Sequence, residues 1–170
     1  MFRGWDNVFM LLGTASGGLI GLVFIVITLT AGYDRDRAMR GASRYMTPTL
    51  VQFAVVLVIS AISLAPLDAG LQRGALALLA LAALIFTLAD TLRMFLAGGD
   101  GVVHWSDPWC YAVAPAISYV LVGVAAMAGW ALGLGALALV ILMCGIRNAW
   151  DLITWLAPRG PGPGATPPPG

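Results

Sequence analysis

The chain has 170 residues, of which 60% are hydrophobic and only 10% are charged. This balance lies well outside that of an ordinary soluble domain and indicates a protein of the lipid bilayer. All nine basic residues are arginine and all eight acidic residues are aspartate, which leaves a net charge of +1. A charge so close to zero offers no basic surface for nucleic acid, so we expect no nucleic-acid partner.

Residues 8–30 form the first long apolar run, which has roughly the 20 residues that a helix needs to cross about 30 Å of hydrocarbon. The run is too long for the core of a cleavable signal peptide, so we predict a permanent span. Gly13, Gly17 and Gly21 recur at every fourth position, which places small residues on one helix face where another helix can approach closely. We expect this stripe to pack within the chain, with a second copy of the chain as the alternative.

Four arginines occupy the segment between the first and second apolar runs: Arg35, Arg37, Arg40 and Arg44. Short loops rich in arginine are held on the cytoplasmic side while a membrane protein inserts. This loop therefore sets the predicted orientation of the whole chain.

The second span is predicted over residues 48–65. Thr47 and Pro48 form a typical helix start, in which threonine caps the helix and proline takes the first helical position. Three polar side chains within the span are expected to bond a neighbouring helix or the backbone of their own helix: Gln52, Ser60 and Ser63.

The third span is predicted over residues 74–96. Thr87, Asp90 and Arg93 follow one another at intervals of three residues near its end, so they share one face of the helix. An ionisable group inside a span is costly unless it is paired. We therefore expect Asp90 to have a partner.

The fourth and fifth spans are predicted over residues 109–132 and 136–156, with a tight turn at Gly133-Leu134-Gly135 between them. Pro115 removes one backbone hydrogen bond, so a kink or local unwinding is expected near it. The tail, residues 158–170, is rich in proline and glycine and is predicted to be disordered.

One group of polar residues stands out against the apolar background, at the predicted inner ends of the third and fifth spans: Asp90, Arg93, Arg147, Asn148 and Asp151. Asp90 with Arg93 and Arg147 with Asp151 have the spacing of ion pairs along one helix. If the third and fifth helices pack together, Asp90 also reaches Arg147. These charges are expected to hold the register of the helices, and the alternative is an ion or proton path.

With the arginine loop inside, five spans place seven of the nine arginines on the cytoplasmic side. This bias predicts an N-terminus outside the cell, a cytoplasmic C-terminus and a location in a cell membrane, most simply a bacterial inner membrane. The sequence thus predicts an all-α fold, a polytopic transmembrane bundle of five helices joined by short loops.

Catalytic signals are weak in this sequence. It has one histidine, His104, and two cysteines, Cys110 and Cys144, without the spacing of metal ligands. It also has no phosphate-binding loop, dinucleotide motif or haem attachment motif, so we expect no enzyme activity, no metal and no cofactor. A nucleophilic pair of His104 and Cys110 remains as an alternative that requires the loop between them to fold back.

We therefore expect a non-enzymatic accessory protein or a self-associating structural subunit. Its expected partners are the lipid bilayer and either a second copy of the chain or another membrane protein. The alternative function is that of a small ion or proton channel or transporter, which would use the Asp90 and Arg147 charges as its path.

Overall fold

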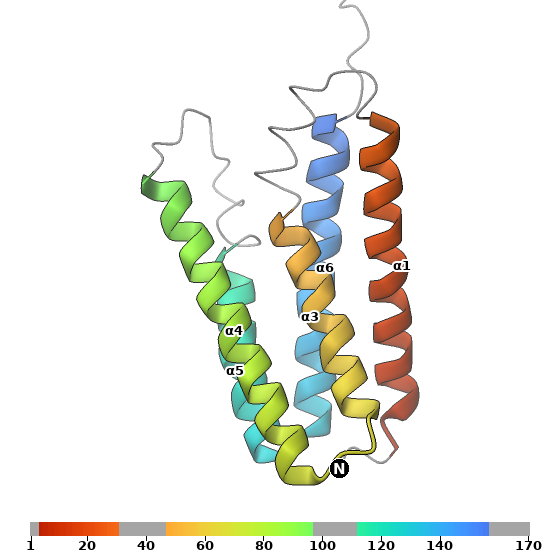
Figure 1. The fold of residues 1–170 in the computed structure, drawn as a ribbon, viewed down its shortest axis with the longest axis vertical. Helices are drawn as coiled ribbons and strands as arrows, with labels where there is room; N and C mark the ends of the chain where they lie inside the picture. The colour runs from red at the N-terminus through yellow and green to blue at the C-terminus, as the bar shows by residue number, and fades with distance from the viewer. Residues whose placement is uncertain (1–3, 31–46, 97–111, 157–170) are drawn as a thin grey trace, which may run out of the picture.

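The computed structural model describes residues 4–30, 47–96 and 112–156, which are all helical apart from short turns. Consecutive helices run in alternate directions along one long axis (Figure 1). The predicted all-α bundle is therefore confirmed. In chain order, the helices of the described residues are α1 (Asp6–Thr30), α3 (Thr47–Leu64), α4 (Ala69–Leu96), α5 (Ala114–Ala128) and α6 (Ala131–Leu156).

Four of these helices, α1, α3, α4 and α6, are long and apolar enough to cross a membrane. Their length and composition indicate a membrane protein. Helix α5 is also apolar, but its 15 residues cover only about 22 Å of a hydrocarbon core of about 30 Å. The predicted fourth span, residues 109–132, is thus only partly accounted for, because residues 97–111 lie outside the described part of the chain.

Helix α3 occupies the centre of the bundle, where it packs against α1, α4 and α6. Helix α5 packs against α4 on one side and α6 on the other, and α1 also contacts α6. Figure 1 shows α4 and α5 running as one pair beside the group formed by α1, α3 and α6. The largest apolar side chains that are fully buried between these helices are Phe9, Phe53, Ile59, Leu76, Leu134, Ile141 and Leu152.

The outward faces of the helices are also apolar. Leu11, Leu78, Val124 and Met143, from four different helices, are 57–69% exposed in the isolated chain. A soluble protein rarely exposes apolar side chains all around its surface, whereas lipid tails solvate them readily. The exposed faces therefore fit a bundle surrounded by lipid.

The turn between α5 and α6 lies at Gly129 and Trp130, so its predicted position at residues 133–135 is wrong. Gly129 has a left-handed backbone with φ of 70°, which glycine adopts without strain. Its N–H donates to the Ala126 carbonyl at 3.1 Å, and the Trp130 N–H donates to the Ala125 carbonyl at 2.9 Å. This pair of bonds ends α5 as a Schellman motif.

Gly133 and Gly135 instead lie in the first turns of α6, where their lack of a side chain makes room for aromatic rings. A Cβ atom on Gly133 would overlap the Trp130 ring, and one on Gly135 would lie 3.4 Å from the Trp5 ring. In sequence, a glycine that accommodates a ring looks the same as a glycine that makes a turn.

The third helix starts earlier than predicted, at Ala69 rather than residue 74. Gln72, which precedes the predicted span, is 2% exposed in the first turn of α4. Its Nε2 donates to the carbonyls of Ile62 at 2.9 Å and Ser63 at 3.0 Å. These carbonyls belong to the last turn of α3, where a helix has no partners of its own. Gln72 therefore caps α3.

We expected Pro115 to interrupt the fourth span by removing one backbone hydrogen bond, but it lies where the described helix α5 begins. Residues 112 and 113 form a π-helical turn, and Pro115 follows in the first turn of α5. Proline is tolerated at this position because the first residues of a helix need no backbone donor.

Tryptophans mark both ends of the bundle. Trp5 and Trp130 lie near the beginning of α1 and α6, at the end where the N-terminus is marked (Figure 1), and Trp150 lies near the end of α6. Trp130 and Trp150 are separated by about 30 Å of helix, which matches the thickness of the hydrocarbon core. This spacing is typical of aromatic residues at the two interfaces of a bilayer.

Candidate functional site

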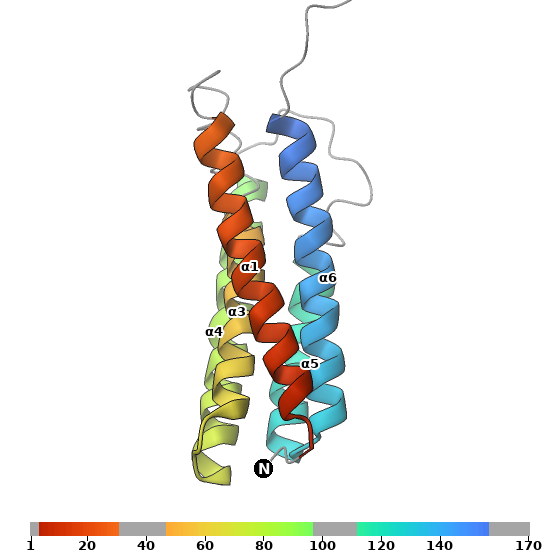
Figure 2. The same ribbon diagram turned by 90° about the vertical axis from the view of Figure 1, so that its right-hand side faces the viewer.

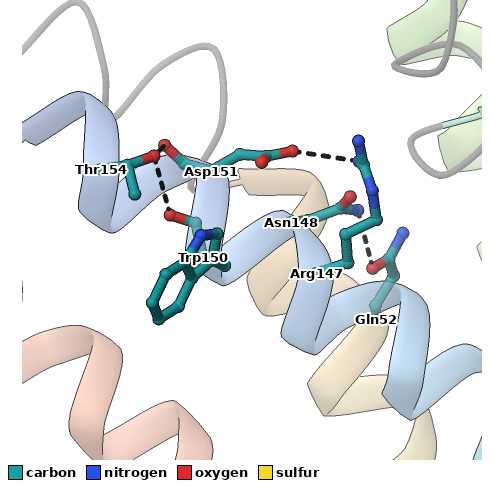
Figure 3. A network of polar contacts seen from close by, with 6 residues as sticks. All are labelled: Gln52, Arg147, Asn148, Trp150, Asp151 and Thr154. Carbon is teal, nitrogen blue, oxygen red and sulfur yellow. Dashed lines mark hydrogen bonds and ion pairs between the residues drawn. The ribbon is translucent and has the colours of Figure 1, made fainter.

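The polar residues near the end of α6 form the network shown in Figure 3. Arg147 Nη1 lies 3.0 Å from Asp151 Oδ2, one helical turn further along, and the two side chains are 38% and 33% exposed. This is the pairing along one helix that the spacing predicts. The ion pair neutralises both charges locally. Because both side chains are partly exposed near the end of a span, they can extend toward the polar boundary of the bilayer.

Asn148 points into the core, although it is the neighbour of Arg147 in sequence. Its Nδ2 donates to Gln52 Oε1 on α3 at 3.1 Å (Figure 3). Asn148 is 0% exposed and Gln52 is 2% exposed, so the bond is sealed from lipid and solvent. The sequence predicted that Gln52 bonds a neighbouring helix, but it did not identify Asn148 as the partner.

The close packing of α3 against α6 at Gly145 accompanies this bond. A Cβ atom on Gly145 would lie 2.6 Å from Phe53 Cε1, so only glycine lets the buried Phe53 ring settle against α6. The Phe53 carbonyl in turn accepts a hydrogen bond from Ser16 Oγ on α1. Polar contacts thus tie α1, α3 and α6 together beside the same aromatic ring. Ser16 was not predicted as a contact residue, because a serine among glycines carries no distinguishing pattern in the sequence.

Asp90 and Arg93 belong to a different part of the bundle. Asp90 is partly exposed and Arg93 is exposed near the end of α4, and neither makes a hydrogen bond or ion pair with another described residue. The end of α4 diverges from α6 (Figure 1), and these two helices do not pack extensively. The described structure therefore brings Arg147, Asn148 and Asp151 together but leaves Asp90 and Arg93 apart from them. The expected Asp90–Arg93 and Asp90–Arg147 pairs are not formed.

The glycine stripe of α1 is divided between two environments. Gly13 faces α3, where an added Cβ would lie 3.0 Å from Ser60 Cβ. Gly17 and Gly21 are exposed, and nothing described lies within 4 Å of an added Cβ on either of them. The expected packing within the chain therefore holds for Gly13 and not for the other two.

Other predicted features lie outside the described residues: Arg35, Arg37, Arg40, Arg44, His104, Cys110 and the tail at residues 158–170. Cys144 is described and is partly buried on α6. Within the described ranges, no three histidine, cysteine or acidic side chains group in a way that could hold a metal ion.

Comparison of the chain with family models, curated proteins and solved structures found no match. The class of protein therefore rests on the fold, a helical bundle in which four described helices are long and apolar enough to cross a membrane, with a buried uncharged contact, Gln52–Asn148, between α3 and α6.

Proposed function

We propose that the protein is a non-enzymatic membrane subunit that self-associates through the outward face of α1. The observation that carries this proposal is a patch of small residues that no described part of the chain covers: Thr14, Gly17, Gly18 and Gly21. All four residues are exposed, and nothing described lies within 4 Å of an added Cβ on any of the three glycines. We call these four residues the α1 patch.

One glycine of α1, Gly13, already allows close packing against another helix. At Gly13, the absence of a side chain lets α3 approach until Ser60 fills the space. Each glycine inside a helix costs about 1 kcal/mol relative to alanine. The three glycines of the α1 patch have no such contact within the described chain, so a second copy that packs on them would supply one.

The hydroxyl of Thr14 is a second argument for a second copy of the chain as the partner. Thr28, Thr91 and Thr154 each donate to the carbonyl four residues earlier on their own helix, at 2.7–3.1 Å. Thr14 makes no hydrogen bond with any described residue, and lipid tails offer none. Hydroxyls between membrane helices bond across the interface, and two facing copies of Thr14 have the donors and acceptors to do so.

Buried side chains favour this function over an ion path. On the face of α3 that carries Gln52 and Ser60, the turns between them are filled by Val56 and Ile59, which are both 0% exposed. Eight residues of helix correspond to about 12 Å, so an apolar layer of that thickness interrupts the polar face. The charge cluster that would have formed the path is also divided between α4 and α6.

We further propose that the C-terminus lies in the cytoplasm and the N-terminus outside, in a bacterial inner membrane. Support comes from the arginines. Arg93 and Arg147 lie toward the end where α1 ends and α3 begins, which is the end that the four-arginine loop joins, and Arg73 lies toward the other end (Figure 1). This asymmetry follows the positive-inside rule.

Energy transfer between donor-labelled and acceptor-labelled copies in liposomes tests the association. Leucine at both Gly17 and Gly21 would hold two copies apart, so we expect the fraction of dimer at a given lipid dilution to fall at least tenfold. Ala82→Leu on α4 is the matched control, because Ala82 is also a small exposed residue and its substitution should leave transfer unchanged. Equal transfer in the double variant and the parent protein would refute the proposal.

A further inference from the structure

Two residues with buried polar side chains lie where α3 ends and α4 begins, and the Gln72 amide bonds the backbone carbonyl of Ser63. Gln72 is 2% exposed and Ser63 is 6% exposed. Gln72 Nε2 donates to the carbonyls of Ile62 and Ser63 at 2.9 and 3.0 Å. Because both acceptors are carbonyl oxygens, the NH₂ group of Gln72 must face them, and this fixes the orientation of the amide.

The other half of the same amide is left unsatisfied. Gln72 Oε1 is buried and has no hydrogen-bond partner among the described residues, and the same holds for Ser63 Oγ. A serine hydroxyl can rotate toward a carbonyl of its own helix, but an amide oxygen only accepts hydrogen bonds. Gln72 Oε1 therefore requires a donor at this place in an apolar bundle.

We propose that Gln72 Oε1 and Ser63 Oγ bind a water molecule enclosed between α3 and α4. Both atoms belong to neutral groups, and the nearest acid along the chain, Asp68, is exposed rather than buried with them. A neutral ligand with two donors and two acceptors matches this pair, since it can donate to the amide oxygen and exchange a second bond with the hydroxyl. Such a water completes the cap that Gln72 places on α3.

A third buried oxygen lies one helical turn away. Ser60 Oγ also has no partner among the described residues, and a Cβ atom on Gly13 would lie 3.5 Å from it. Gly13 of α1 therefore closes the bundle beside Ser60. Ser60 and Ser63 are three residues apart, so their side chains lie toward the same side of α3, one helical turn from each other.

The Gln72 side chain can be observed selectively by NMR, because Gln52 and Gln72 are the only glutamines in the sequence. Protein labelled with ¹⁵N in the glutamine side chains gives two NH₂ signals, which the Gln52→Met variant assigns. In lipid nanodiscs, we expect a nuclear Overhauser effect from long-lived water to the Gln72 amide protons. Gln52 is the comparison within the molecule, since its amide oxygen already accepts from Asn148.

Ser63→Ala removes one of the two ligands of the water. We expect the water signal at Gln72 to fall at least threefold in this variant, while an unchanged Gln52 signal shows that the bundle is still folded. A folded parent protein without any water signal at Gln72 would overturn the proposal, since the Ser63 hydroxyl would then be the donor. An unchanged signal in Ser63→Ala would also overturn it, because Ser63 would then not hold the water.

Discussion

At the scale of single residues, the contact between Gly145 and Phe53 sets how closely α3 and α6 approach. Phe53 is 0% exposed, so its ring has no free space into which it can move. The same close approach brings Asn148 within reach of Gln52. A bond between two neutral amides suits the inside of a membrane bundle, because neither partner has to bury a charge.

Gly145→Ala tests this contact. The added methyl group would lie 2.6 Å from the Phe53 ring. Overpacking a core in this way costs about 1–3 kcal/mol, against a gain of about 1 kcal/mol in helix propensity, so we expect a net loss of up to about 2 kcal/mol. Unfolding in mixed micelles by titration with sodium dodecyl sulfate measures the difference.

Gly74→Ala is the control for that experiment. Gly74 also lies within a helix, but nothing described lies within 4 Å of an added Cβ. The Gly74→Ala substitution should therefore leave the stability of the bundle unchanged or raise it by up to about 1 kcal/mol. If Gly145→Ala proved as stable as Gly74→Ala, the Phe53 ring would not be confined as described.

At the scale of helices, the separation of α4 from α6 changes the role that we expected for Asp90. The spacing of Thr87, Asp90 and Arg93 predicts that they share one face of the third helix, but periodicity does not say which helix lies opposite. Helix α4 pairs with α5 and touches α3 near the turn between them, and α6 pairs with α3 and α5. Asp90 is therefore no countercharge for Arg147, whose ion pair is with Asp151.

Two substitutions test whether Asp151 or Asp90 is the countercharge of Arg147. Asp151→Asn removes the charge that faces Arg147, and we expect a loss of about 0.5–1 kcal/mol, because the pair is about one-third exposed. Asp90→Asn should change stability by less than about 0.5 kcal/mol, since Asp90 has no ion pair within the described structure. The same detergent titration measures both variants. A larger loss for Asp90→Asn than for Asp151→Asn would show that Asp90 is the true countercharge.

The existence and approximate limits of the helices followed from the sequence, because long apolar runs bounded by charges leave few alternatives. Two boundaries were wrong for physical reasons. Gln72 falls in the predicted loop between the second and third spans, whereas it lies in α4 and its side chain caps α3. Gly133 and Gly135 were assigned to a turn, whereas they make room for the rings of Trp130 and Trp5.

The candidate site was only partly predictable. The Arg147–Asp151 pair depends on spacing along one helix, so the sequence was sufficient to predict it. The Gln52–Asn148 bond joins residues 96 positions apart, and nothing local marks either amide as the partner of the other. The sequence also did not show that Gly13 packs against α3 while Gly17 and Gly21 are exposed, because all three glycines belong to the same four-residue repeat.

At the scale of the whole molecule, α1 lies at one side of the bundle and faces the viewer in Figure 2. It packs against α3 and α6 on the side away from the viewer, which leaves the α1 patch exposed on the described bundle. A second copy related by two-fold symmetry would present the same patch, so one surface would serve both partners. Self-association through α1 would therefore close into a dimer rather than continue into a chain of copies.

Disulfide cross-linking in native membranes tests this claim most directly. In a background without Cys110 and Cys144, single cysteines at positions 14, 17 and 21 should form cross-linked dimers on mild oxidation. Cysteines at positions 78 and 85 are the comparison, because Leu78 and Ile85 are 68% and 58% exposed on α4, away from the α1 patch. We predict dimers at the three α1 positions and monomers at the two α4 positions. Cross-linking at the α4 positions with none on α1 would contradict the proposed dimer.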